Sequence, residues 1–463
     1  MHNLGIHLDT DKKESSWRDF QTDYIVKKKK KVLLFNTAKA IIGFVAILLL
    51  MISLFLFNSP AREMEKKFSK LQTKALEELP PLPEPLKLSK QKLNQIISNT
   101  KFINTDKNIF FVDTPEESYK ITTSIDVFLQ EFLLSQMEQL KKLTRGKPER
   151  IALVVMEADT GKIIAMTGFD LENPEENPCF KSDYPAASIF KIITAAAAVE
   201  TLGYTPQTPL FFNGSKYTLY KRQLKDLKNK YSARISFSRA FAESVNPVFG
   251  KIGKNDLGKE KLDSYADAFG FNQVINSELP FVTGSFETNS SDYHLAELGC
   301  GFNHDTTISP VFGAMLISAI INSGDLMLPS IIEHVTGTDG KIIYQNNIST
   351  YRSAVRPETA TTMIQLLEKT ISKGTARKSF RGSSKDAVLS QLVIGGKTGS
   401  LYNKAHTVKY DWFTGFGTEK KGTRKIAISV VVGHRKYIGT RASTYAKMIL
   451  KQYYKRNDAT AQL

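Results

Sequence analysis

The sequence has few residues of the kinds that hold metal ions or form disulfide frameworks. Its 463 residues include two cysteines, Cys179 and Cys300, and seven histidines. Neither cysteine lies in a Cys-x-x-Cys pair and no His-Glu-x-x-His motif occurs, so nothing indicates a zinc ribbon, a redox pair or a zinc protease. We therefore expect no metal and no cofactor. Whether the two cysteines form a disulfide is left open, because their separation in sequence does not give their distance.

Repeats and nucleic-acid motifs are also missing. No repeat of solenoid length is visible, and the Gly-Phe-Gly at 415–417 lacks the strand, turn and acidic partner of a dinucleotide site. The chain has 63 basic and 46 acidic residues, a net charge of +17. Because no nucleic-acid motif with interleaved aromatics accompanies this charge, we expect no nucleic-acid partner. A net positive charge favours binding to an anionic surface or a polyanion. The alternative interpretation is that the basic residues only keep the protein surface solvated.

One long uncharged run lies near the N-terminus. Residues 40–57 are eighteen residues without a charge, about enough for a helix that crosses a ~30 Å hydrocarbon core. Five lysines at 27–31 precede the run, which predicts that the basic tail, 1–39, lies in the cytoplasm and that the rest is exported. A cleaved signal peptide fits poorly, because the leader is long and no small-x-small site follows. The sequence predicts a transmembrane signal anchor.

The remainder divides into a linker and one large domain. Residues 61–79 place apolar side chains on one helical face, and the proline-rich segment 80–86 predicts a stiff extended spacer. We assign residues 58–105 to this amphipathic helix and linker, and 106–463 to the domain.

Strands precede and follow a helical middle in this domain. The chain turns helical after Asp126, and the Asp-Thr-Gly at 159–161 predicts the turn of a hairpin. Residues 188–203 predict a helix that is capped by Ser188 and ends at a glycine. Three strands and a last helix follow near the C-terminus. This order predicts an α+β fold, in which helices cover both faces of a mainly antiparallel sheet and a helical lobe is inserted.

A serine and a lysine stand together at the start of the alanine-rich helix. Ser188 and Lys191 share a helical face, so the lysine amine can reach the serine hydroxyl. Lysine serves as a base only where burial or a nearby positive charge lowers its pKa, and the surrounding isoleucines and alanines favour burial. Taken alone, Ser-x-x-Lys recurs by chance, and a capping serine beside an exposed lysine is the commoner case.

Two further motifs favour a serine nucleophile. Ser244-Val245-Asn246 follows Ser188 by 56 residues, and Lys397-Thr398-Gly399 follows Asn246 by 151. The combination of S-x-x-K, S-D-N and K-T-G is typical of penicillin-binding proteins and class A β-lactamases. Val245 replaces the aspartate and leaves both functional side chains in place. The sequence resembles the penicillin-binding protein transpeptidase family over roughly residues 109–450, and similar segments also occur at 119–130, 154–166, 306–329, 372–377 and 411–417.

The resemblance implies a fold and a set of catalytic roles. The fold would be that of the β-lactamases and transpeptidases, with a five-stranded antiparallel sheet. Ser188 would attack the carbonyl between two D-alanines of a peptidoglycan stem peptide, and Lys191 would take its proton. Ser244 would relay a proton to the leaving amine, with Lys397 sustaining a positive field. Asn246 would bind the substrate amide and orient Lys191.

It also implies the substrate-binding residues. Thr398 and Ser400 would bind the terminal carboxylate, and the backbone N–H groups of Ser188 and Ser400 would form the oxyanion hole. Gly399 would leave the strand edge open for the substrate.

The function implied is that of a monofunctional D,D-transpeptidase in a bacterial cytoplasmic membrane, inhibited by β-lactams. Its partners would be two stem peptides, one a donor and one an amine acceptor, and a separate glycan-polymerising membrane protein, because residues 58–105 leave no room for such a domain. A D,D-carboxypeptidase stays open, since water and amine acceptors use the same residues. A β-lactamase would need a base for deacylation, for example in a Glu-x-x-x-Asn loop after the second motif, and the sequence there does not match this pattern. A non-catalytic scaffold or sensor should have lost a motif residue, and none is lost.

Overall fold

The computed structural model describes residues 88–98, 105–115 and 117–460. The predicted membrane anchor, 40–57, and the amphipathic stretch at 61–79 lie outside these residues. Within the described ranges, no helix combines the length and the apolar character that crossing a bilayer requires.

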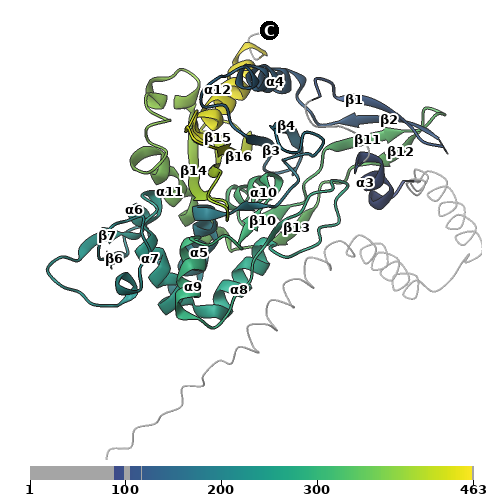
Figure 1. The fold of residues 1–463 in the computed structure, drawn as a ribbon. Helices are drawn as coiled ribbons and strands as arrows, with labels where there is room; N and C mark the ends of the chain where they lie inside the picture. The colour runs from purple at the N-terminus through teal and green to yellow at the C-terminus, as the bar shows by residue number, and fades with distance from the viewer. Residues whose placement is uncertain (1–87, 99–104, 116, 461–463) are drawn as a thin grey trace, which may run out of the picture. The chain divides into compact units, whose positions relative to one another are not determined.

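A five-stranded antiparallel sheet forms the centre of the domain, as predicted (Figure 1). The hairpin expected around 159–161 is its first pair of strands, and both are almost entirely buried because apolar residues occupy both faces. The remaining three strands come from the C-terminal part of the chain. In spatial order the strands are β14 (Leu392–Tyr402), β15 (Lys409–Glu419), β16 (Lys425–His434), β3 (Arg150–Glu157) and β4 (Ile163–Asp170).

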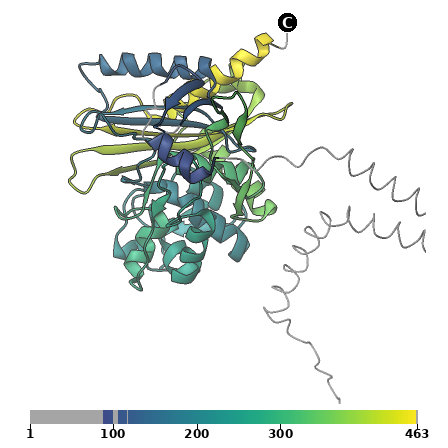
Figure 2. The same cartoon turned by 90° about the vertical axis from the view of Figure 1, so that its right-hand side faces the viewer.

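Helices cover both faces of this sheet (Figure 2). Helix α4 (Val127–Lys141) begins at Asp126, whose side chain accepts the N–H of Leu129, so the predicted change from strand to helix is confirmed. It packs with α12 (Ala442–Thr460) on one face. The other face carries α10 (Pro310–Ile321), in which all twelve residues are buried, and α11 (Pro357–Lys373).

The inserted helical lobe lies between β4 and β14 in sequence and holds most of the short helices. The predicted helix at 188–203 is a 3-10 turn, η1 (Ala187–Phe190), followed by α5 (Lys191–Leu202), and it ends at Gly203 with φ 66°. The other elements of the lobe are α6 (Phe237–Ala242), α7 (Asn246–Lys251), the π-helical turn η3 (Ile252–Leu257), α8 (Gly258–Phe269), α9 (Asp292–Cys300) and the 3-10 turn η2 (Lys221–Leu224).

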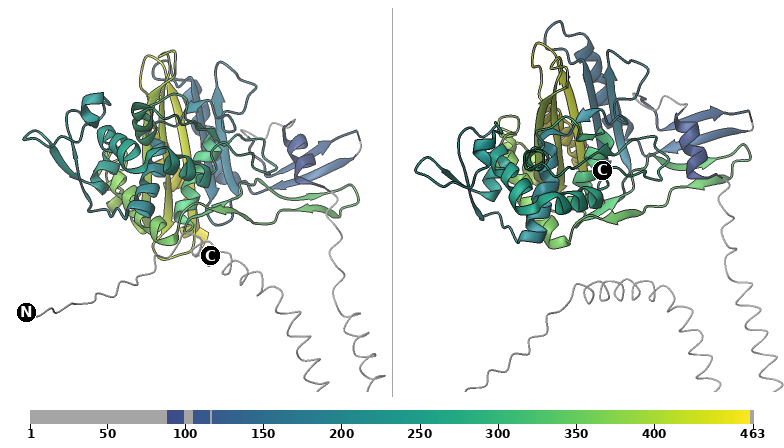
Figure 3. Two further views of the ribbon diagram at one scale, coloured as in Figure 1. Left: turned by 90° about the horizontal axis from the view of Figure 1, so that it is seen from below. Right: turned by 60° about the horizontal axis from the view of Figure 1, so that its bottom comes forward.

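Smaller sheets extend from this body. The hairpin of β6 (Pro209–Phe212) and β7 (Ala233–Ser236) projects from the lobe, as Figure 3 shows. A separate four-stranded sheet extends from the side of the domain opposite to this hairpin (Figure 1). Its strands are, in spatial order, β1 (Ile109–Asp113), β2 (Ser118–Thr123), β11 (Ile332–Thr336) and β12 (Ile342–Gln345). The short elements are β5 (Tyr184–Pro185), β8 (Gly284–Ser285), β9 (Thr307–Ile308), β10 (Asp325–Met327), β13 (Thr350–Ser353), η4 (Ser383–Lys385) and η5 (Leu389–Gln391).

Helix α3 (Lys90–Ser98) packs on the core of this domain, although it lies upstream of the domain start expected at residue 106. Leu93 and Ile97 are buried, and the N–H of Leu88 donates to the carbonyl of Ile343 on β12 at 3.2 Å. The apolar spacing in α3 explains this packing, since the buried residues Leu93, Ile96 and Ile97 lie on one face of the helix.

Candidate active site

Ser188 lies inside the 3-10 turn η1 and does not cap the helix, so the predicted cap is wrong. The turn begins one residue earlier, at Ala187, which has a left-handed φ of 49°. Gly301 packs against this turn with φ 68°, and a Cβ at that position would overlap the carbonyl oxygen of Ala187. Glycine there allows the end of α9 to approach the serine closely.

The amine of Lys191 is completely buried and donates to three oxygens. Its Nζ lies 2.8 Å from Ser188 Oγ, 2.8 Å from Asn246 Oδ1 and 2.6 Å from the carbonyl oxygen of Cys300. All three acceptors are uncharged. Loss of hydration therefore lowers the pKa of Lys191 to about 8, close enough to neutrality for the amine to take a proton from Ser188.

Ser244 and Asn246 lie at the junction of α6 and α7. Ser244 adopts a left-handed φ of 57°, which turns the chain sharply between the two helices. The Nδ2 of Asn246 donates to the carbonyl of Tyr217 at 3.1 Å, and this bond fixes the amide so that its oxygen faces Lys191. A second buried amine, Lys397 Nζ on β14, lies 3.0 Å from Ser244 Oγ.

Lys397 resembles Lys191 in its surroundings. Its amine also donates to the carbonyl of Thr398 at 2.8 Å and lies 5.6 Å from the centre of the Phe241 ring. Burial, together with the charge of nearby Lys191, holds the pKa of Lys397 well below its ordinary value. The structure thus brings all five predicted catalytic side chains into one centre built from η1, the α6–α7 junction and β14.

The three predicted substrate-binding residues follow Lys397 on β14, which pairs only with β15 among the described strands. Residue sides alternate along a strand, so Lys397 and Gly399 face inward, while Thr398 and Ser400 are more accessible. A Cβ on Gly399 would lie 3.2 Å from Ile189 Cγ1 and 3.3 Å from the carbonyl oxygen of Ala186. Glycine therefore lets β14 approach η1, a reason additional to the open edge expected from sequence.

The sequence matches the family described as the penicillin binding protein transpeptidase domain over residues 151–455. The chain belongs to this family. Peptidoglycan D,D-transpeptidase PbpA of Mycolicibacterium smegmatis is 26% identical over 322 residues, covering 62% of this chain and 62% of that protein. Stage V sporulation protein D of Bacillus subtilis is 23% identical, covering 62% of this chain and 45% of that protein. The chain therefore spans less than two thirds of the length of these relatives.

A solved structure confirms the fold of this transpeptidase domain. The imipenem acyl-enzyme complex of penicillin-binding protein A from M. tuberculosis has a TM-score of 0.58 at 22% identity, covering 72% of this chain and 79% of that one. The expected antiparallel sheet with its inserted helical lobe is thus the fold of the penicillin-binding proteins.

Three groups in the centre of the transpeptidase domain were not predicted. The carbonyls of Cys300 and Tyr217 hold Lys191 and Asn246, and a backbone carbonyl has no signature in sequence. The hydroxyl of Thr375, after α11, lies 2.5 Å from that of Thr398. Its segment, 372–377, resembles the family in sequence, and that similarity is the signal by which Thr375 could have been found.

The side chains of the two cysteines and of Trp412 have no catalytic role in this arrangement and are part of the buried interior. Cys179 and Cys300 are both buried and free, so the structure contains no disulfide between them. Burial raises the pKa of the Cys300 thiol to about 11, which keeps it neutral. Trp412 is fully buried and its Nε1 donates to the carbonyl of Pro185 at 2.9 Å, so it belongs to the core and not to the catalytic centre.

Proposed function

We propose that this chain is a peptidoglycan D,D-transpeptidase that works through an acyl-enzyme on Ser188. The observation that carries the proposal is the buried amine of Lys191, which lies 2.8 Å from Ser188 Oγ and has only uncharged oxygens as partners. A lysine in such surroundings can exchange a proton at neutral pH. The names of the PbpA relatives, which state this activity for those proteins, support the same reaction here.

Acylation follows from the positions of these groups. Ser188 Oγ attacks the carbonyl carbon between the last two D-alanines, and its proton moves to Lys191 Nζ. The N–H groups of Ser188 and Ser400 stabilise the negative charge that develops on the carbonyl oxygen. When the C–N bond breaks, the leaving amine of D-alanine takes a proton from Ser244, which Lys397 contacts at 3.0 Å, and Ser244 regains the proton that Lys191 took from Ser188. The products are an ester on Ser188 and free D-alanine.

Deacylation by an amine completes the cross-link. The acceptor amine attacks the ester carbonyl, loses a proton to the lysine and serine pair, and forms a new amide bond. Ser188 leaves with a proton and the centre returns to its starting state. Before D-alanine leaves, Thr398 and Ser400 would hold the terminal carboxylate of the donor, and Gly399 keeps β14 close to the serine. This site needs no cofactor for either step.

The alternatives share the first half of this reaction. A D,D-carboxypeptidase would use water in place of the amine at the same ester. A β-lactamase needs a base for rapid hydrolysis, and among the described residues no carboxylate bonds to Ser188 or Lys191. A non-catalytic scaffold is disfavoured by the complete hydrogen-bonded centre.

The proposal also covers the location of the catalytic domain relative to the membrane. Residues 40–57 would anchor the chain in a bacterial cytoplasmic membrane, with the tail 1–39 inside and the catalytic domain, with its linker 58–105, outside. A separate glycan-polymerising membrane protein would supply the glycan strands. β-Lactams would acylate Ser188 as substrate mimics.

Covalent labelling with a fluorescent penicillin, followed over hours, tests the proposal. We expect a stable label on the wild-type chain and none on Ser188→Ala. Drug consumption without a stable label would instead identify a β-lactamase. The absence of both labelling and consumption would overturn the enzyme assignment and favour a scaffold.

A further inference from the structure

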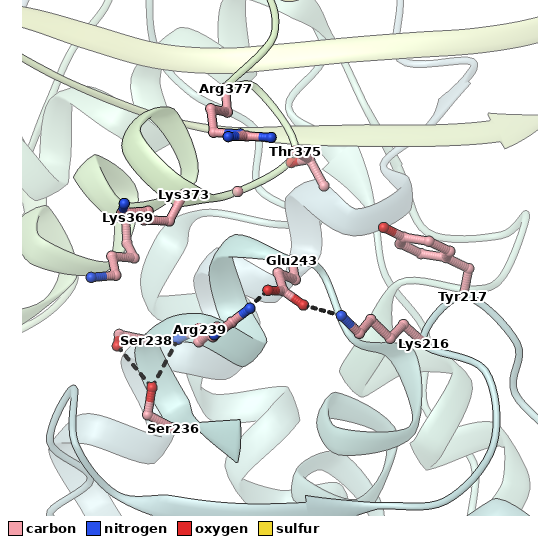
Figure 4. A pocket seen from close by; sticks show the side chains of 11 residues that line it. Lys216, Tyr217, Ser236, Ser238, Arg239, Glu243, Lys369, Lys373, Thr375 and Arg377 are labelled. Carbon is pink, nitrogen blue, oxygen red and sulfur yellow. Dashed lines mark hydrogen bonds and ion pairs between the residues drawn. The ribbon is translucent and has the colours of Figure 1, made fainter. Parts of the chain in front are cut away.

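A positively charged cleft of about 700 Å³ opens beside the catalytic centre (Figure 4). Its walls come from two sides: the end of α11 with the loop that follows, and α6 with its flanking residues and the loop at 216–217 after β6. Its lining residues are Lys216, Tyr217, Ser236, Ser238, Arg239, Glu243, Lys369, Lys373, Gly374, Thr375 and Arg377.

The lining contains five basic side chains and one acidic side chain. The carboxylate of Glu243 already pairs with both Lys216 and Arg239. Lys369, Lys373 and Arg377, on the opposite wall, form no ion pair with any carboxylate in the part of the chain that the structure describes. The cleft therefore offers unneutralised positive charge to a ligand, which suits an anion.

Two contacts connect this cleft to the reacting groups. Thr375, in its lining, is hydrogen-bonded to Thr398, the residue expected to bind the terminal carboxylate. Tyr217, also in its lining, supplies the carbonyl that holds Asn246. The cleft thus begins at the end of the site where the leaving D-alanine would lie.

We propose that this cleft binds the acceptor stem peptide, and that its lysines and arginine recognise free carboxylates on that peptide. The inference rests on the proposed transpeptidase function. By microscopic reversibility, the attacking amine approaches the ester from the side on which the leaving amine departed. An acceptor in that position has to extend past Thr398 and Thr375, which leads it into the cleft. Its carboxylates then meet Lys373 and Arg377.

The test compares aminolysis with hydrolysis of one acyl-enzyme. A small thioester donor acylates Ser188, and the product ratio is measured with an acceptor peptide that has free carboxylates and with its carboxamide analogue. This ratio does not depend on how fast the acyl-enzyme forms. We expect Lys373→Gln with Arg377→Gln to lower the ratio about tenfold for the carboxylate peptide, the size expected for two exposed charge pairs. The ratio for the carboxamide should change less than about twofold, because it offers no charge to these residues.

A matched control separates local recognition from net charge. Lys378→Gln with Lys385→Gln removes the same charge from two exposed residues outside the cleft lining, and it should leave both ratios unchanged. Equal losses in the two double variants, equal losses for the two peptides, or no aminolysis by the wild type would overturn the acceptor site while leaving acylation intact. Absence of the acyl-enzyme itself would overturn the proposed function as well.

Discussion

Two regions of the domain bury cations in opposite ways. At the start of β3, Arg150 Nε lies 2.6 Å from Asp170 Oδ2, and another of its nitrogens lies 2.6 Å from Asp183 Oδ2. In the catalytic centre, Lys191 and Lys397 are fully buried, but their hydrogen-bond partners are hydroxyl, amide and carbonyl oxygens. The arginine has two carboxylates and the lysines have none.

The difference distinguishes Arg150, a cation with a structural role, from Lys191 and Lys397, which we expect to take part in proton transfer. A buried cation paired with carboxylates keeps its proton, because the opposite charge compensates lost hydration. A buried lysine among neutral oxygens has no such compensation, so its pKa falls and its proton becomes exchangeable. The same domain therefore pairs its permanent cation with carboxylates and surrounds the lysines, whose charge has to change, with neutral oxygens.

Replacing the exchangeable cation by a permanent one is the strongest test of this comparison. Lys191→Arg keeps a positive charge, but a guanidinium does not deprotonate in proteins. We expect the second-order rate of penicillin acylation to fall about a thousandfold, within the range for loss of a general base. Stopped-flow or gel-based labelling measures that rate, with thermal unfolding as the control for folding. A variant within tenfold of wild type would show that Lys191 acts only through its charge.

Adding a carboxylate to the catalytic centre should make it resemble the Arg150 site. Asn246→Asp places a negative charge beside Lys191 Nζ, which raises the pKa of the lysine by about 1 to 3 units. We expect roughly a hundredfold slower acylation at pH 7, recovering at higher pH as the lysine loses its proton. The pH profile of labelling distinguishes this effect from a simple loss of binding, which would slow the reaction equally at every pH.

The wild-type pH profile sharpens the comparison without a mutation. Because burial lowers the pKa of Lys191 to about 8, the reactive neutral amine increases as the pH rises toward that value. The acylation rate should rise about tenfold per pH unit below about 8 and level off above it. Penicillin labelling between pH 5 and about pH 10 measures this. A rate that falls with increasing pH would mean that the protonated lysine is the active form.

The smallest effect on acylation is expected at the structural cation. Arg150→Met leaves Asp170 buried without its partner, which should lower the free energy of unfolding by about 3 kcal/mol or more. Acylation of the remaining folded protein should be unchanged. Chemical denaturation measures the stability, and adding Asp170→Asn should restore most of it because the uncompensated charge is then gone. A stability equal to wild type in the single variant would contradict a role for this pair.

Side-chain motifs allowed much of the catalytic centre to be predicted. Ser188, Lys191 and Lys397 could be placed together, because a nucleophile and its proton carriers need particular side chains in a particular order along the chain. The strands around 159–161 were predictable because their apolar residues are interrupted by a clear turn. These features are local, and sequence records them directly.

Features made by the backbone or by distant packing could not be predicted. The carbonyl of Cys300 holds Lys191 through a peptide oxygen that any residue would provide. Ser188 was expected to cap a helix, but the left-handed turn at Ala187 starts the helix before it. The unpaired charges of Lys373 and Arg377 face a cleft only because α11 ends opposite α6. Each of these depends on how separate elements meet.

The order of the strands also determines when each strand can find its partner during synthesis of the chain. Strand β3 lies between β4 and β16 in the sheet. One edge of this buried, apolar strand therefore stays unpaired until β16 is synthesised, about 280 residues later. At about 5–20 residues per second, the ribosome needs roughly 15 to 55 s to supply it. During that interval the β3–β4 hairpin exposes an edge that can pair with other chains. A chain that ends before β16 would keep this edge permanently, and we expect such truncated chains to aggregate.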